Sequence, residues 1–192
     1  MLVLLLGLVL FLGVHSVRIV APAWREAMIA RRGDNAWKGL YSLVAGLGLV
    51  LIVWGYGLAR LDPVVLYAPP LWARHIALVL MMPVFVMLAA AYIPGRIKSA
   101  LKHPMLAAVK LWAVAHLIAN GTLADVLLFG SLLAWAVVDR ISLKRRPATA
   151  NDVPSLPPAP ANDLIAVVIG ATLYVVFLLF LHEWLFGASP LG

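Results

Sequence analysis

Two histidines, His15 and His116, lie inside long apolar stretches of the sequence. A charged side chain at the centre of a bilayer costs roughly 2.5 to 3.5 kcal/mol on insertion scales, so ionisable side chains at that depth are candidates for function. An imidazole can ligate a metal or transfer a proton. Metal ligation is therefore one interpretation of this pair. The other is a pair of structural imidazoles, hydrogen-bonded to backbone carbonyls or to each other.

Spacing along the predicted helices places further side chains beside these histidines. Residues four positions apart share one face of a helix. Arg18 follows His15 by three positions and is expected on the same face. Two facing stripes, each with one imidazole, would enclose a flat cofactor. The residues that share a stripe with a histidine are Trp112 and Asn120 with His116, and Gly7 and Phe11 with His15.

The rest of the ligand inventory narrows the chemistry. Cysteine is absent, which excludes disulfides, iron–sulfur clusters, thiolate-ligated haem and covalently attached haem. No two histidines lie three or four positions apart, so the histidine boxes of membrane desaturases are missing. His182-Glu183 lacks the second histidine of a zinc protease motif. Haem b, with two axial imidazoles and its propionates near Arg18, fits what remains.

Glycine motifs for phosphate binding are not found in a suitable setting. The triplets "GLG" at 46–48 and "GYG" at 55–57 fall within a predicted helix. Small residues at such positions let helices approach closely in a membrane. The sequence therefore predicts close helix packing at these glycines and no nucleotide site.

Composition identifies the elements that must position these residues. Hydrophobic residues make up 64% of the 192-residue chain, charged residues 12%, and the mean hydropathy is +1.01. A membrane-spanning helix needs about 20 apolar residues. The sequence predicts an all-α, polytopic transmembrane helical bundle of about six spans, the fourth and fifth of them short. The predicted spans are 2–20, 39–59, 71–93, 105–120, 123–138 and 164–186.

Every second connection between the predicted spans is rich in basic residues, and this pattern predicts the orientation of the chain. They concentrate between the first and second, third and fourth, and fifth and sixth predicted spans. The positive-inside rule then places both termini on the outer side of the membrane. Under this topology His15 and His116 are expected at a similar depth toward the cytoplasmic side, and His75 and His182 near the outer surface. The net charge of +7 is explained by loops that face anionic lipid, so nucleic acid is not an expected partner.

A proline-rich segment divides the chain. The stretch "PATANDVPSLPPAPAND" after Arg146 is polar and holds five prolines, which predicts an extended tether. The predicted domains are a five-helix core at 1–143, a cytoplasmic linker at 144–163, and a last helix with its tail at 164–192. Asn162-Asp163 is expected to start that last helix, and Thr122 with Asp125 forms a capping box after the Asn120-Gly121 turn.

Five short motifs, in their order along the chain, resemble the NnrU family. They are "LFLGVHSVR", "KGLYSLV", "KHP", "LWAVAHLIANG" and "LHEWLFGASP". The resemblance implies a polytopic membrane protein associated with bacterial denitrification, related to the zeta-carotene isomerase, a haem b membrane enzyme. It carries the haem histidines onto His15 and His116. It also carries onto His103 a His-Pro position whose role is expected near the haem edge or in the fold of the loop, and not on the iron. No long polyene channel is indicated, so isomerisation of carotenoids is not expected.

Three functions remain open from the sequence. The first is a haem b protein with a redox, gas-sensing or isomerase role, in which Trp112 lies beside the ring. The second is a non-enzymatic assembly or maturation factor for nitric-oxide or nitrite reductase components, with structural histidines. The third is a methyltransferase-like enzyme, because "KHPMLA" is similar to the Arg-His-Pro signature of membrane methyltransferases.

Overall fold

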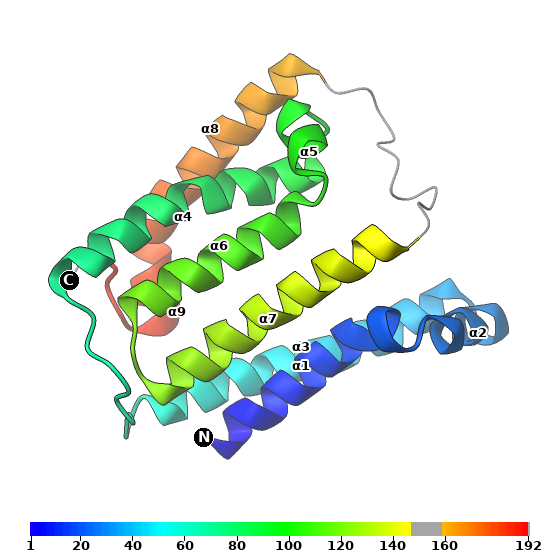
Figure 1. Cartoon of the computed structure of the whole chain (residues 1–192), viewed down its shortest axis with the longest axis horizontal. Helices are drawn as coiled ribbons and strands as arrows, with labels where there is room; N and C mark the ends of the chain where they lie inside the picture. Colours follow the sequence, from blue (N-terminus) through cyan, green and yellow to red (C-terminus); the bar gives the residue numbers. More distant parts are fainter. Residues whose placement is uncertain (147–158, 192) are drawn as a thin grey trace. The chain divides into compact units, whose positions relative to one another are not determined.

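The computed structural model describes residues 1–146 and 159–191. Within these residues the chain is helical and contains no strand beyond one isolated bridge between Val65 and Thr122. Helices that are long and apolar enough to cross a membrane confirm the predicted all-α transmembrane fold (Figure 1). They are α1 (Leu2–Val20), α3 (Asp34–Ala59), α4 (Leu71–Tyr92), α7 (Leu123–Arg145) and the segment Ala161–Phe186.

The segment at the C-terminal end is helical throughout, with a local change in winding. It comprises α8 (Pro160–Val176), the π-helical turn η2 (Phe177–Leu181) and α9 (His182–Phe186). The predicted fourth span corresponds to α6 (Pro104–Ala119), which has only 16 residues. Two short helices were not predicted, because neither holds an apolar run of span length: α2 (Pro22–Arg32) and α5 (Arg96–Leu101).

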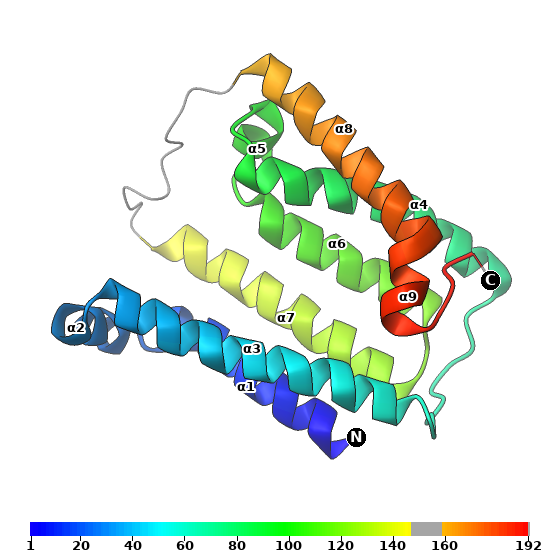
Figure 2. The same ribbon diagram turned by 180° about the vertical axis from the view of Figure 1, so that it is seen from behind.

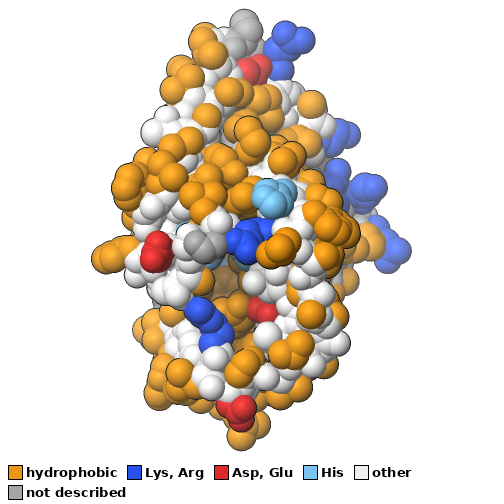
Figure 3. Space-filling model, turned by 90° about the vertical axis from the view of Figure 1, so that its left-hand side faces the viewer, with side chains coloured by type: hydrophobic (Ala, Val, Ile, Leu, Met, Phe, Trp, Pro, Cys, Tyr) orange, Lys and Arg blue, Asp and Glu red, His pale blue; other side chains and the backbone are white. Residues whose placement is uncertain are grey.

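The outer surface of the helices is strongly apolar. Long aliphatic and aromatic side chains of the spans are exposed, and hydrophobic atoms cover much of the face shown in Figure 3. Among the described residues, Asp125 is the one charged side chain in the buried class, with 3% of its surface exposed. Apolar faces of this kind are solvated by lipid tails in a bilayer.

The described chain divides into two compact units. The first comprises Met1–Leu66 and Thr122–Ser142, and the second comprises Tyr67–Gly121 and Leu143–Gly192. In the first unit α1 and α3 lie side by side (Figure 1, Figure 2). Their backbones touch where glycine leaves room: a Cβ on Gly7 would lie 2.5 Å from the nitrogen of Ile52, and a Cβ on Gly48 would lie 2.7 Å from the nitrogen of Phe11. The predicted close packing is confirmed at Gly48 and Gly55, whereas Gly46 and Gly57 face open space.

The second unit is built on α4, which packs against both α6 and α8. Alanines dominate its buried positions, so these helices approach closely. The prediction that Asn162-Asp163 starts the last helix is wrong, because α8 already begins at Pro160. The Asp163 carboxylate instead accepts hydrogen bonds from the backbone nitrogens of Arg96 and Ile97, at 3.1 and 3.0 Å, and so caps α5.

The chain around the predicted linker is helical on both sides. Helix α7 continues to Arg145, beyond the predicted end at 138, because charged residues end the apolar run without ending the helix. Residues 147–158 of the proline-rich segment lie outside the described part of the chain.

The predicted capping box is confirmed: the Asp125 carboxylate accepts from the nitrogen of Thr122 at 2.9 Å, and the Asp125 nitrogen donates to the Thr122 hydroxyl at 3.3 Å.

Candidate functional site

His15 lies in α1, in the first unit, and is surrounded by aromatic rings. Its ring centroid is 4.2 Å from that of Phe11, 5.1 Å from that of Tyr41 in α3 and 5.6 Å from that of Trp135 in α7. Its Nδ1 lies 2.6 Å from the carbonyl oxygen of Phe11. Because a carbonyl only accepts, Nδ1–H is the donor, and in the neutral ring Nε2 then carries the lone pair.

Trp135 adds an unusual feature next to this imidazole. Its Nε1 is buried, and it has no hydrogen-bond partner among the described residues. An indole N–H is only a donor, and a buried donor left unpaired costs about 1 to 3 kcal/mol. The ring stands at 87° to the His15 ring. The environment of His15 therefore holds a donor that a bound molecule with an acceptor atom would satisfy.

Arg18 lies in the last turn of α1, three residues after His15, and its side chain is exposed. A cation at a helix C-terminus interacts favourably with the helix dipole, which explains the position without any ligand. The same guanidinium is also a suitable partner for a carboxylate.

His116 lies in the last turn of α6, in the second unit, and repeats the arrangement of His15. Its Nδ1 donates to the carbonyl oxygen of Trp112 over 2.8 Å, and the two rings have centroids 5.0 Å apart. The Asn120 side chain donates to the His116 carbonyl oxygen over 2.9 Å and so helps to end the helix. Trp112 and His116 therefore share a face of α6 as predicted, whereas Asn120 is the extended residue just beyond the end of the helix.

His103 occupies a different position in the same unit. It is the N-cap residue of α6, and its carbonyl oxygen accepts from the nitrogen of Ala107 over 3.1 Å. Because α6 is continuous from Pro104 to Ala119, a rise of about 1.5 Å per residue separates His103 from His116 by about 20 Å. These two histidines therefore belong to opposite ends of the helix and do not share a metal.

His75 and His182 have their own surroundings in the second unit. His75 is exposed on α4. His182 donates from Nδ1 to the carbonyl oxygen of Ala188 over 2.7 Å and lies 5.1 Å, between ring centroids, from Phe186. The described residues contain no group of three or more His, Asp or Glu side chains placed to hold a metal ion. A metal site made from protein ligands alone is therefore not supported within them.

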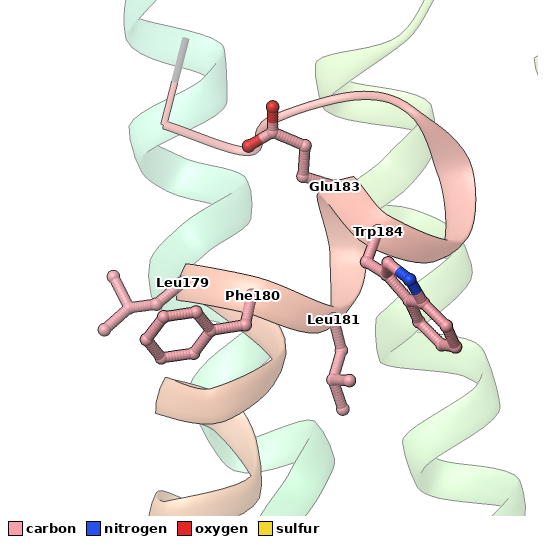
Figure 4. Close-up of a pocket in the computed structure, with 5 residues that line it drawn as sticks. All are labelled: Leu179, Phe180, Leu181, Glu183 and Trp184. Atoms are coloured by element: carbon pink, nitrogen blue, oxygen red, sulfur yellow. The ribbon is translucent and has the colours of Figure 1, made fainter.

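A hollow of about 490 Å³ lies beside the C-terminal helical turns. Figure 4 shows Leu181 and Trp184 on one side of the chain, while the Glu183 carboxylate points to the other. Its walls include no histidine. A π-helical turn often marks a functional position, but the side chains here are apolar apart from Glu183.

The sequence identified only part of the surroundings of these histidines. Trp112, Asn120 and Phe11 were found because they share a helix with a histidine. Tyr41 and Trp135 were missed because they come from α3 and α7, and no local spacing indicates such contacts. The available signal was the indole nitrogen of Trp135 within an apolar run, since it needs an acceptor. His15 and His116 fall in different units, so their pairing stays a prediction.

Comparison with known proteins gives one family and no further relative. No curated protein and no solved structure matches the chain significantly. The model of the family described as "NnrU protein" matches residues 3–190, which is nearly the whole chain. This match confirms, over nearly the whole chain, the family resemblance seen in the short motifs around His15 and His116. The chain is a membrane protein that belongs to the NnrU family.

Proposed function

We propose that this protein binds haem b, which the imidazoles of His15 and His116 would hold through their Nε2 atoms. The observation that carries the proposal is the hydrogen bond that both imidazoles make to the backbone of their own helix. Each ring donates from Nδ1 to the carbonyl oxygen four residues earlier, over 2.6 Å in His15 and 2.8 Å in His116. Histidines that ligate a metal almost always donate their other ring nitrogen in this way, which fixes the tautomer and the ring orientation.

The residues around His15 fit a porphyrin better than a bare metal ion. A haem iron takes four nitrogens from its own macrocycle, so two imidazoles suffice. Aromatic side chains from α1, α3 and α7 surround the ring and provide the apolar walls that a flat cofactor needs. The unpaired Nε1–H of Trp135 offers a hydrogen bond to a bound group. Arg18 would pair with a propionate from the exposed end of α1.

The role proposed for this site is in nitrite or nitric-oxide metabolism, because the NnrU family is associated with denitrification. When bound, haem b supplies a redox-active iron that favours electron transfer with two axial imidazoles and binds small gases when one position is open. The protein's own contribution is to orient the two imidazoles through their carbonyl bonds and to exclude water with apolar spans. Its proposed location is the bacterial inner membrane, with both termini in the periplasm.

Absorption spectroscopy tests this proposal directly. Protein expressed with a haem precursor and purified in detergent should show a Soret band that shifts on reduction. His15→Ala and His116→Ala should each lose most of that band, whereas His75→Ala, at an exposed position of α4, should keep it. A colourless wild type, or equal bands in all three variants, would contradict haem binding at this pair.

One observation favours a second candidate function. His182 also donates from Nδ1 to a backbone carbonyl, at Ala188, so this bond also occurs outside the proposed ligand pair. With structural histidines, the protein would act as an assembly partner of nitric-oxide or nitrite reductase components. Alanine variants at His15 and His116 would then lower thermal stability but still co-purify with those components.

A further inference from the structure

Helix α2 lies between two membrane-spanning helices but is unlike them. Its 11 residues include Arg25, Glu26, Arg31 and Arg32, and at about 1.5 Å per residue it is only about 16 Å long. A short polar helix of this kind lies in the interface of a bilayer instead of crossing it. It packs against α3 in the first unit.

Aromatic and cationic groups fix this helix to the start of α3. Trp37 of α3 is 8% exposed, and the Trp24 ring meets it edge-on with centroids 5.9 Å apart. The Arg25 guanidinium lies 5.8 Å from the centroid of the Trp37 ring, within the range of a cation–π contact. Gly33 joins the helices with a φ of 83°, a left-handed value that glycine adopts without strain. The turn therefore brings the end of α2 back beside Trp37.

A cavity of about 150 Å³ lies at this junction. Its walls are apolar apart from one guanidinium, so the cavity combines a cation with hydrophobic surface. This combination matches an amphiphile with an anionic group, since a guanidinium binds phosphate through two parallel hydrogen bonds. The lining residues are Met28 and Arg32 from α2, and Ala36, Trp37 and Leu40 from α3.

The charges around the cavity favour an anion. Segment 22–40 carries four basic and two acidic side chains. One acid, Asp34, is already paired with Lys38 over 2.5 Å, so its charge is offset and it does not compete with a bound anion for Arg32. The other acid, Glu26, is exposed on α2. Basic pockets at the end of membrane helices are typical sites for anionic lipid headgroups.

We propose that this cavity is a binding site for one anionic phospholipid. The Arg32 guanidinium holds the phosphate, and Met28 and Trp37 contact the glycerol region. Leu40, 48% exposed within a membrane-spanning helix, continues the apolar wall toward the acyl chains. Inorganic phosphate would contact only the guanidinium, so the apolar walls select the lipid over the free ion. The site is independent of haem binding.

Adjacent arginines provide a matched test. The full-length protein is reconstituted in nanodiscs with spin-labelled phosphatidylglycerol or phosphatidylcholine, and the immobilised fraction of each lipid is measured. Arg32→Gln and Arg31→Gln each remove one exposed charge, but only Arg32 lines the cavity. We expect Arg32→Gln to weaken the preference for phosphatidylglycerol roughly tenfold, and Arg31→Gln by about two- to threefold through general surface attraction.

Two results would overturn the proposal. Equal losses in the two arginine variants would show general attraction to the charged surface and no specific site. Displacement of the anionic lipid by inorganic phosphate at constant ionic strength would show a phosphate site that ignores the acyl chains. Helical content by circular dichroism and the Soret band, if present, are measured in both variants, so that loss of folding is distinguished from loss of lipid.

Discussion

At the scale of single residues, the surroundings of His15 differ from those of an ordinary buried imidazole. A structural histidine is explained once its own ring nitrogens are satisfied. Here the neighbouring Trp135 also presents a buried Nε1–H with no partner among the described residues. A group held by His15 that carries an acceptor atom would explain both side chains together.

Trp135→Phe separates these explanations. The variant removes the donor but keeps an aromatic ring, so haem retention in a competition titration with apomyoglobin should fall by about fivefold or more. The thermal stability of the apoprotein should change by less than about 1 kcal/mol, since loss of an unpaired donor and creation of a small void have opposite effects. Trp24→Phe, at a position 52% exposed, is the control. Equal haem retention in both variants would remove Trp135 from the site.

Residue-scale prediction from the sequence succeeded where the partners share a helix. His116, Trp112 and Asn120 are four residues apart, and the hydrogen bonds between them follow that spacing. The Tyr56 hydroxyl donates to Asp125 over 2.5 Å, and this contact was missed. It joins α3 to α7, so its existence depends on tertiary packing that no local pattern encodes.

At the scale of elements, hydropathy predicted the spans well but their ends less well. The limits of α1 were predicted correctly because its apolar run and its helix end together at Val20. Those of α7 were not, because the helix continues through Asp139 and Arg140. The amphipathic helix α2 was read as a loop, since a polar helix of three turns has no span-length signal.

The α1–α3 contact gives a prediction at this scale. A Cβ on Gly48 would lie 2.7 Å from the backbone nitrogen of Phe11, whose carbonyl orients His15. Gly48→Ala should therefore destabilise the protein by about 1 to 3 kcal/mol and reduce haem retention. Gly46→Ala, two residues earlier in open space, should be neutral or stabilising by up to about 1 kcal/mol. Thermal unfolding in detergent and the Soret absorbance measure both effects.

The outcome that would contradict this prediction is a common response of the two glycines. If both alanine variants lose stability equally, helix flexibility and not the close approach of α1 and α3 is what the glycines provide. If Gly48→Ala unfolds the protein entirely in detergent, the same variant kept in haem-supplied membranes gives a second, milder test of the same contact. A Soret band unchanged at equal protein level would then show that Phe11 does not control His15.

At the scale of the whole molecule, the central question is how often the chain crosses the membrane. Five segments are long enough, and α6 is shorter. The 16 residues of α6 extend about 24 Å, less than the hydrocarbon thickness of about 30 Å. If α6 crosses, the termini lie on the same side; if it does not, they lie on opposite sides. We predict that it crosses, because only with six crossings do all the basic connections lie on the same side of the membrane.

The complete absence of cysteine makes the natural chain a suitable background for accessibility labelling. Leu2→Cys and Ser189→Cys, both at exposed positions, should react with a membrane-impermeant maleimide in intact cells. Ala30→Cys, on the exposed side of α2, should react only after lysis, since the basic connection is expected on the cytoplasmic side. Labelling of Ser189→Cys only after lysis, with Leu2→Cys labelled in intact cells, would mean that α6 does not cross. His116 of α6 would then not lie within a membrane-spanning segment, as its proposed pairing with His15 requires.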